Sequence, residues 1–263
     1  MKTSLVIPAT NGNFNYLKCI LSHYQDGTVK PDQVVISLSN SHLVDQKLIC
    51  QLKERFEGVF EDYKLLEHTS TLVQGPNRDA GTMACDNEII ISNDADDIPH
   101  PQRIEVIKHF FENKQILHLN HSYQTRNDMT FEKINLDEVI CLEPEETFKL
   151  HYRSGDVSDP NISPRPDPRR FGYPFDAYGA VPLWGGHCAT MCGAPAFHKD
   201  VFKTLRWRHT EEWTWDWDFC VDVLYRFRKS VLINSKLMWY NLLPVKTRRD
   251  NANPKHLGLL FKE

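Results

Sequence analysis

The sequence lacks the features that would place it in a membrane, on nucleic acid or among disulfide-linked proteins. Its 263 residues contain no run of about 18 apolar residues, so no segment is expected to span a membrane. Lys and Arg number 31 against 35 Asp and Glu, and this net charge of −4 provides no basic surface for non-specific nucleic-acid binding. Seven cysteines at scattered spacings predict reduced thiols in a cytoplasmic protein, which would meet a membrane only at its surface.

The chain also shows no internal repeat and no linker that would separate two domains. Its first residues, Met1–Pro8, have too short an apolar part for a signal peptide and predict a strand instead. Aromatic and branched aliphatic residues are plentiful, which excludes intrinsic disorder. One domain over residues 1–263 is therefore expected. Six tryptophans are present, and four of them fall between Trp207 and Trp217.

Short apolar runs begin near residues 5, 34, 63 and 88, and helical patterns fill the intervals. This rhythm is typical of βαβ units on a parallel sheet, and the Val- and Ile-rich runs fit strands that are buried on both faces. The patterns predict strands at 5–7, 34–38, 63–66, 88–92 and 116–123, and helices at 13–24, 44–56, 75–85, 101–113, 195–205 and 215–228. Six prolines predict an irregular loop over residues 153–182.

Three carboxylates follow the fourth predicted strand, in the segment Asn93-Asp94-Ala95-Asp96-Asp97. Ligands of open α/β sheets bind at the carboxyl ends of strands. Residues two apart on an extended chain point the same way, so Asp94 and Asp96 can converge on one cation. Mg²⁺ or Mn²⁺ would suit such carboxylates and leave coordination positions for substrate phosphates. The alternative is an acidic turn in which Asp97 begins the next helix.

Four motifs in order resemble those of family 2 glycosyltransferases: Leu5–Asn11, Arg78-Asp79-x-Gly81, Glu88–Asn93 and Asp94–Asp97. The resemblance covers residues 4–110 well and 183–245 loosely. It implies an α/β chain with the GT-A fold, a Rossmann-like mixed central sheet with helices on both faces. Residues 1–113 would then be the nucleotide-sugar-binding half, and residues 114–263 the acceptor-binding half.

The resemblance also implies roles in donor binding. Asp96, with Asp94, would bind Mn²⁺ or Mg²⁺. The residues expected to contact the nucleotide sugar are Pro8, Ala9, Thr10, Asn11, Ser39, Arg78, Asp94 and Ala95. Ser39 or Asn40 stands where the family carries an aspartate that reads the base or ribose, so the donor base stays unassigned. The alternative for Arg78 is an arginine on a helix surface.

The segment Trp215-Asp216-Trp217-Asp218 resembles the family's Glu-Asp-x-Asp motif, with Trp in place of Glu. By this match Asp216 would be the base that takes a proton from the acceptor hydroxyl, with Asp218 and Glu212 in reserve. The alternative is that these acids merely favour a helix N-terminus while the tryptophans pack in the core.

The acceptor is expected to meet Trp184, Gly185, Gly186 and His187, which resemble a pocket-lining segment of the same family, and Trp215, whose ring could stack on a sugar. A zinc site is an alternative for the cysteines and histidines at 187, 188, 192 and 198, but their spacing is marginal and there is no second pair. Arginines at 165, 169, 170, 248 and 249 would either offset a diphosphate or stay solvated.

The sequence thus favours an inverting, metal-dependent glycosyltransferase that moves a sugar from a nucleoside diphosphate to a hydroxyl of a glycan or another acceptor. One alternative is an inactive protein that binds sugar nucleotides or glycans. A nucleotidyltransferase is a weaker alternative, because the segment Pro8–Gly12 lacks the basic, glycine-rich character of a triphosphate-binding loop.

Overall fold

A computed structural model of the chain describes residues 1–124, 131–153, 194–207 and 215–239. The strands are β1 (Thr3–Thr10), β2 (Gln33–Ser39), β3 (Asp62–His68), β4 (Ile89–Ser92), β5 (Ile98–Pro99), β6 (His118–Gln124), β7 (Cys141–Leu142), β8 (Ala196–His198) and β9 (Ser230–Trp239). The α-helices are α1 (Leu17–Gln25), α2 (Gln46–Phe56), α3 (Gln74–Met83), α4 (Arg103–Asn113), α5 (Pro144–Arg153) and α6 (Trp215–Phe227).

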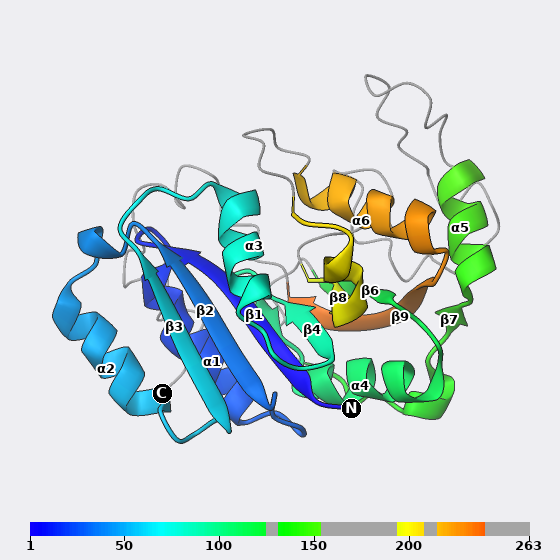
Figure 1. Cartoon of the computed structure of the whole chain (residues 1–263). Helices are drawn as coiled ribbons and strands as arrows, with labels where there is room; N and C mark the ends of the chain where they lie inside the picture. The colour runs from blue at the N-terminus through cyan, green and yellow to red at the C-terminus, as the bar shows by residue number, and fades with distance from the viewer. Residues whose placement is uncertain (125–130, 154–193, 208–214, 240–263) are drawn as a thin grey trace.

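These strands form one mixed sheet, in the order β3-β2-β1-β4-β8-β6-β9-β5, with β7 paired to β9 (Figure 1). Strands β1 to β4 are mutually parallel, β8 runs antiparallel to both β4 and β6, and β9 runs parallel to β6. The chain builds outward from β1 to β3 and then returns to place β4 on the other side of β1. Such a reversal of strand order is where open α/β sheets bind ligands.

Side chains of the central strands alternate between the two faces of the sheet. Leu5 and Ile7 of β1 pack in a large core with residues of α1, α2 and α4. Val6, between them, packs in a second core with α6. Helix α3 covers this second face so closely that a Cβ at Gly81 would lie 2.6 Å from Cγ2 of Val6. Helices therefore cover both faces, as predicted.

Most predicted elements are confirmed, but one predicted helix and one predicted helix cap are wrong. The helix expected over residues 195–205 is instead the short strand β8 followed by a 3-10 helix at Lys199–Lys203, because Ala196 and Phe197 fill a gap between β4 and β6. Asn13 does not cap a helix that begins beside it. Its side chain turns back and accepts a hydrogen bond of 2.7 Å from the backbone N–H of Thr10.

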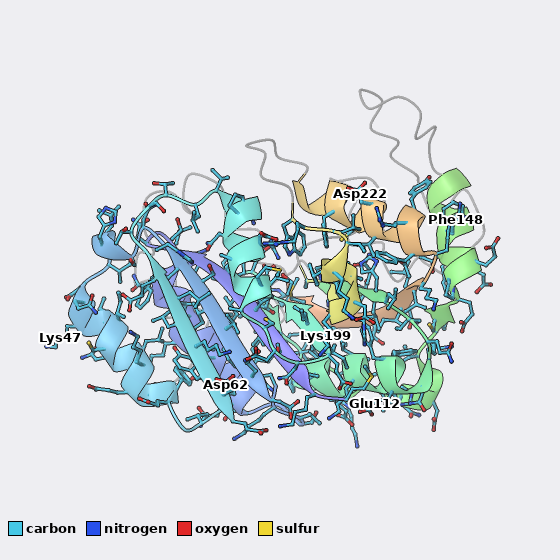
Figure 2. All side chains as sticks on the ribbon, in the orientation of Figure 1. Lys47, Asp62, Glu112, Phe148, Lys199 and Asp222 are labelled. Atoms are coloured by element: carbon cyan, nitrogen blue, oxygen red, sulfur yellow. The ribbon has the colours of Figure 1, made fainter. Side chains whose placement is uncertain are left out.

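The second half of the chain contains elements that the apolar pattern did not predict, namely the two-residue strand β7, the helix α5 and the long strand β9. Helices α5 and α6 lie side by side, and the rings of Phe148 and Tyr225 meet edge to face with centroids 5.2 Å apart (Figure 2). Within the described parts of the chain, every helix is too short or too polar to cross a lipid bilayer.

Candidate functional site

The candidate site lies where β1, β2 and β4 end. These three strands are parallel and adjacent, so the segments after Thr10, Ser39 and Ser92 gather at one edge of the sheet (Figure 1). Both predicted donor-binding segments, Pro8–Asn11 and Asp94–Asp97, are among them. The structure therefore brings together residues that are more than 80 positions apart in the sequence.

Proline at position 8 fits this edge for a simple reason. Strand β1 continues through Pro8 to Thr10, but its pairing with β4 ends at Val6 and Ser92. The carbonyl of Val6 accepts a hydrogen bond of 3.0 Å from the N–H of Asn93, and backbone groups two residues apart face the same side. The nitrogen of Pro8 therefore faces the side on which the pairing with β4 has already ended, so its missing N–H breaks no ladder.

The acidic segment forms a turn that is organised from within. The N–H of Asp97 donates to the carbonyl of Asp94 at 3.1 Å, and the amide nitrogen of Asn93 donates to the carbonyls of both residues at 2.6 and 3.0 Å. Asp94 and Asp96 are half-buried, whereas Asp97 is buried. The helix start at Asp97 that the alternative reading offered is wrong, because β5 intervenes and α4 begins only at Arg103, as the prediction of a helix after Pro101 expected.

Arg78 lies on α3 with its side chain wholly buried, so the alternative of a helix-surface arginine is wrong. Its guanidinium donates hydrogen bonds to the hydroxyl of Ser92 and to the carboxylate of Asp94. Asp94 is half-buried in this ion pair. Arg78 thus fixes the orientation of one carboxylate of the turn and offsets its charge.

The described residues contain no group of three or more His, Cys, Asp and Glu side chains gathered around one point. A divalent cation commonly takes one or two protein carboxylates and completes its shell with phosphate and water oxygens. Asp94 and Asp96, the two half-buried carboxylates of this turn, are the residues here that could hold such an ion.

Ser39 and Asn40 contact a neighbouring loop. The hydroxyl of the buried Ser39 accepts a hydrogen bond of 2.8 Å from the N–H of Leu72 and lies 3.2 Å from the carbonyl of the same residue. Asn40 has φ of 55°, a left-handed conformation that asparagine tolerates, and its side-chain oxygen accepts from the hydroxyl of Thr71 at 2.8 Å. Contact of Ser39 with a nucleotide stays a prediction.

Arg103, which the sequence did not single out, supports the site from the other face of the sheet. It is wholly buried and donates to four oxygen atoms: the hydroxyl of Tyr24, the side-chain oxygen of Asn93 and the carbonyls of Ser92 and Ala194. The hydroxyl of Tyr24 in turn donates to Asn93 at 2.8 Å. The only sequence signal for Arg103 is a charged residue at the start of the apolar pattern of α4.

Trp207 belongs to the core, so for this one of the clustered tryptophans the alternative of core packing is confirmed. Only 1% of its surface is exposed, and its indole N–H donates to the hydroxyl of Thr82 at 3.0 Å. Its neighbour Arg206 forms a two-pronged ion pair with Asp79. The chain before α6 is therefore attached to α3.

Asp216 and Asp218 lie in the first turn of α6, the helix that the sequence predicted there. Trp215 is the first residue of that helix. The remaining predicted residues fall outside the described residues: Glu212, Trp184, Gly185, Gly186, His187, the two cysteines at 188 and 192, and the arginines at 165, 169, 170, 248 and 249. His198 is described, and its ring nitrogen Nδ1 lies 3.3 Å from the N–H of Asp200.

No protein-family model matches the sequence, and no curated protein is similar to it in sequence. Solved structures with a similar fold do exist. S. aureus TarS 1–349 has a TM-score of 0.62 at 15% identity over 91% of this chain, and TarS has also been solved with UDP and with UDP-GlcNAc.

Two further solved structures have a similar fold. The Pyrobaculum calidifontis mannosyltransferase PcManGT, in complex with GDP-Man and Mn²⁺, has a TM-score of 0.58 at 11% identity over 92% of this chain. Glucosyl-3-phosphoglycerate synthase of Mycobacterium tuberculosis, in complex with Mn²⁺, UDP and glucosyl-3-phosphoglycerate, has a TM-score of 0.55 at 13% identity over 93% of this chain.

The chain has a GT-A fold. The predicted fold is therefore confirmed, with the mixed sheet and the helices on both faces that the resemblance implied. In this GT-A fold the acidic turn Asp94–Asp97 lies beside the reversal of strand order. The chain spans 60% of TarS 1–349, 57% of the mannosyltransferase structure and 74% of the synthase structure.

Proposed function

We propose that the chain is an inverting glycosyltransferase that uses a nucleoside-diphosphate sugar and a divalent cation. The observation that carries the proposal is the buried Arg78–Asp94 ion pair beside the half-buried Asp96, at the strand reversal of a GT-A fold. Support comes from the structural neighbours, whose names record UDP, UDP-GlcNAc and GDP-Man, two of them together with Mn²⁺. Likeness at this identity establishes the fold, and the activity is our inference from the site.

The donor would bind across the ends of β1 and β4. The nucleoside would meet the segment Pro8–Asn11, whose exposed Asn11 begins a turn tied by Thr10 and Asn13. Mn²⁺ or Mg²⁺ would be held by Asp96 and would offset the charge of the leaving diphosphate. Arg78 would keep Asp94 oriented toward the ribose or the cation.

The acceptor hydroxyl would lose its proton to a carboxylate oxygen of Asp216 as it attacks the anomeric carbon. Carbon–oxygen bond formation and departure of the diphosphate in one displacement invert the anomeric configuration. Trp184, Gly185, Gly186, His187 and Trp215 are the proposed acceptor-binding residues. A carboxylate at a helix start suits a base that must stay ionised between turnovers.

The first test is a thermal-shift screen against UDP-, GDP-, dTDP- and CMP-sugars with Mn²⁺. A specific donor should raise the unfolding temperature, since a ligand that binds only the native state stabilises it by mass action. Failure of every nucleotide to stabilise the protein, with and without Mn²⁺, would contradict the proposal.

The second test compares Asp96→Ala and Asp216→Asn with the control Asp200→Asn, which changes an exposed carboxylate on the 3-10 helix Lys199–Lys203. Asp96→Ala should remove metal-dependent transfer. Asp216→Asn should keep donor binding but lose transfer, because the amide cannot accept the proton. If both variants transfer sugar like the control, the assigned site is wrong. Donor binding by the unaltered chain without turnover would instead favour an inactive sugar-nucleotide binder.

A further inference from the structure

Two consecutive residues of α3 connect this helix to different parts of the site. Arg78 reaches across to Ser92 and Asp94 at the end of β4. Asp79 faces the segment that leads into α6, where it receives two hydrogen bonds from Arg206, of 2.8 and 2.5 Å. One turn of helix is thus in contact with both the acidic turn and the chain that precedes the predicted base.

Trp207, the residue after Arg206, contacts both Arg78 and α6. The guanidinium carbon of Arg78 lies 5.6 Å from the centroid of its ring, within the range of a cation–π interaction. On the other side the ring stacks on Phe219 of α6, with centroids 4.1 Å apart and an angle of 28° between the planes. A continuous series of contacts therefore runs from Asp94 through Arg78 and Trp207 to the second turn of α6.

An ion pair anchors Arg206, and a hydrogen bond orients the neighbouring indole ring of Trp207. Its N–H donates to the hydroxyl of Thr82 at 3.0 Å, one helical turn after Arg78. The ion pair beside it joins an Asp79 side chain that is only 6% exposed to an Arg206 side chain that is 53% exposed. A buried carboxylate with such a partner resists separation, because losing the partner would leave its charge in a poorly solvated place. Packing alone would require neither contact.

We propose that Trp207 is a positioning residue that sets the first turn of α6, and with it Asp216, against the donor-binding turn Asp94–Asp97. The inference rests on the proposed function and extends it to a residue that does not touch the reacting atoms. Donor binding at the acidic turn is transmitted through Arg78 and Trp207 to the backbone of α6. Arg206 and Thr82 keep the ring in the orientation that makes this contact series continuous.

The test uses two variants that remove the same hydrogen bond from opposite sides. Trp207→Phe keeps an aromatic ring against Phe219 but has no N–H, and Thr82→Val keeps the shape of the side chain but has no acceptor. Arg206→Ala and Arg206→Lys form a second pair, in which lysine preserves the charge that faces Asp79. The control is Lys203→Ala, which breaks an exposed pair with Asp200 in the adjacent 3-10 helix.

Turnover and donor KM are measured with the donor found in the nucleotide-sugar screen. Hydrogen exchange of the α6 amides is measured with and without UDP or GDP and Mn²⁺. We expect Trp207→Phe, Thr82→Val and Arg206→Ala to lower kcat about tenfold while donor KM changes less than about twofold, since small misplacement of a catalytic group is costly. In the unaltered protein the nucleotide should protect α6 amides, and this protection should be lost in the same three variants and regained in part in Arg206→Lys.

Three results would overturn the proposal. The first is kcat that falls only in proportion to the folded fraction, which would reduce Trp207 to a packing role. The second is a donor KM that rises at unchanged kcat, and the third is full nucleotide-dependent protection of α6 in the variants. An unaltered protein that binds no nucleotide would overturn the proposed function itself, and the positioning role with it. An active protein whose variants behave like Lys203→Ala would overturn the positioning role alone.

Discussion

Two arginines are wholly buried at the same strand end, one on each face of the sheet. Arg78 comes from α3 and Arg103 from α4, and both donate to Ser92, the last residue of β4. Their further partners differ in charge. Arg78 pairs with the carboxylate of Asp94, whereas the four oxygen atoms that Arg103 contacts all belong to neutral groups.

The difference separates two tasks that a charged turn imposes on the protein. Arg103 connects α1, the residue after β4 and the segment before β8 through Tyr24, Asn93 and Ala194, so it holds the backbone that carries the turn. Arg78 acts on a side chain of the turn itself. One arginine stabilises the fold around the site, and the other adjusts the charge that a donor would meet.

The largest expected effect on stability is that of Arg103→Met. The substitution leaves several buried oxygen atoms without a donor, and we expect it to lower the free energy of unfolding by about 3–5 kcal/mol. Urea unfolding measures this loss. Arg103→Lys should recover only part of it, because one ammonium group cannot reach every acceptor of the planar guanidinium. A loss below about 1 kcal/mol would show that Arg103 is not the main support of this strand end.

Compared with Arg103→Met, Arg78→Met should cost less stability and should mainly weaken nucleotide binding. Its loss of stability should be smaller, about 2 kcal/mol, because the half-buried Asp94 can regain water. The dissociation constant for UDP or GDP with Mn²⁺ should rise about tenfold or more, which corresponds to about 1.4 kcal/mol. Calorimetric titration measures it against Arg55→Met, which removes an arginine that lies over Phe56 on α2, away from the strand ends. Equal affinity in the two variants would contradict the role given to Arg78.

Acidification should lower the free energy of unfolding through His121, a buried histidine that is influenced by the charge of Arg103. Burial, and secondarily the charge of Arg103, lower the pKa of His121 to about 3, so this ring is neutral in the folded protein. An unfolded histidine has a pKa near 6.5, hence the unfolded chain binds the extra proton first as the pH falls. Stability contributed by neutral His121 is therefore present above about pH 6.5 and lost as the pH falls from there toward 3.

We expect this loss to amount to about 1–2 kcal/mol between about pH 7 and pH 5. Urea unfolding at the two pH values should show a smaller change in His121→Gln, whose side chain does not titrate. His118 stacks on Phe197 on the other face of the sheet, and burial lowers its pKa to about 3 as well. His118→Gln is therefore the matched comparison, because it removes a second buried, neutral histidine. If the pH dependence of stability is the same in His121→Gln as in the unaltered protein, the ring of His121 does not gain a proton on unfolding.

The strands β1, β2 and β4 and the acidic turn after β4 were predicted well from the sequence, because their signals are local in the chain. The apolar run before Asn93, the acidic residues after it and the motif around Arg78 are each readable over a few residues. The strands of the second half depend on pairing between distant segments. Strand β8 has three residues and is placed only by its two antiparallel neighbours, so Phe197 resembled part of a helix.

Dependence on distant segments also explains why the sequence did not single out the supporting residues Arg103 and Arg206. The role of Arg103 depends on Tyr24, 79 positions away, and that of Arg206 on Asp79, 127 positions away. An arginine at the start of a helix or in a connecting segment looks solvated unless its hydrogen-bond acceptors elsewhere in the fold are known. The tryptophan count pointed to an unusual segment, yet only the fold shows that Trp207 lies in the core.

The smallest expected effect is also the sharpest check on the separation of the two arginines. Burial raises the pKa of Tyr24 to about 12 against the opposing influence of Arg103, so its hydroxyl stays protonated and donates to Asn93. Tyr24→Phe removes one acceptor of Arg103 and one donor to Asn93, and we expect unfolding to become easier by about 1 kcal/mol. Nucleotide affinity should not change, because Arg78 and Asp94 are untouched. If titration instead shows weaker UDP or GDP binding in Tyr24→Phe at unchanged stability, the Arg103 face serves the donor directly, and the two tasks are not divided between the two faces.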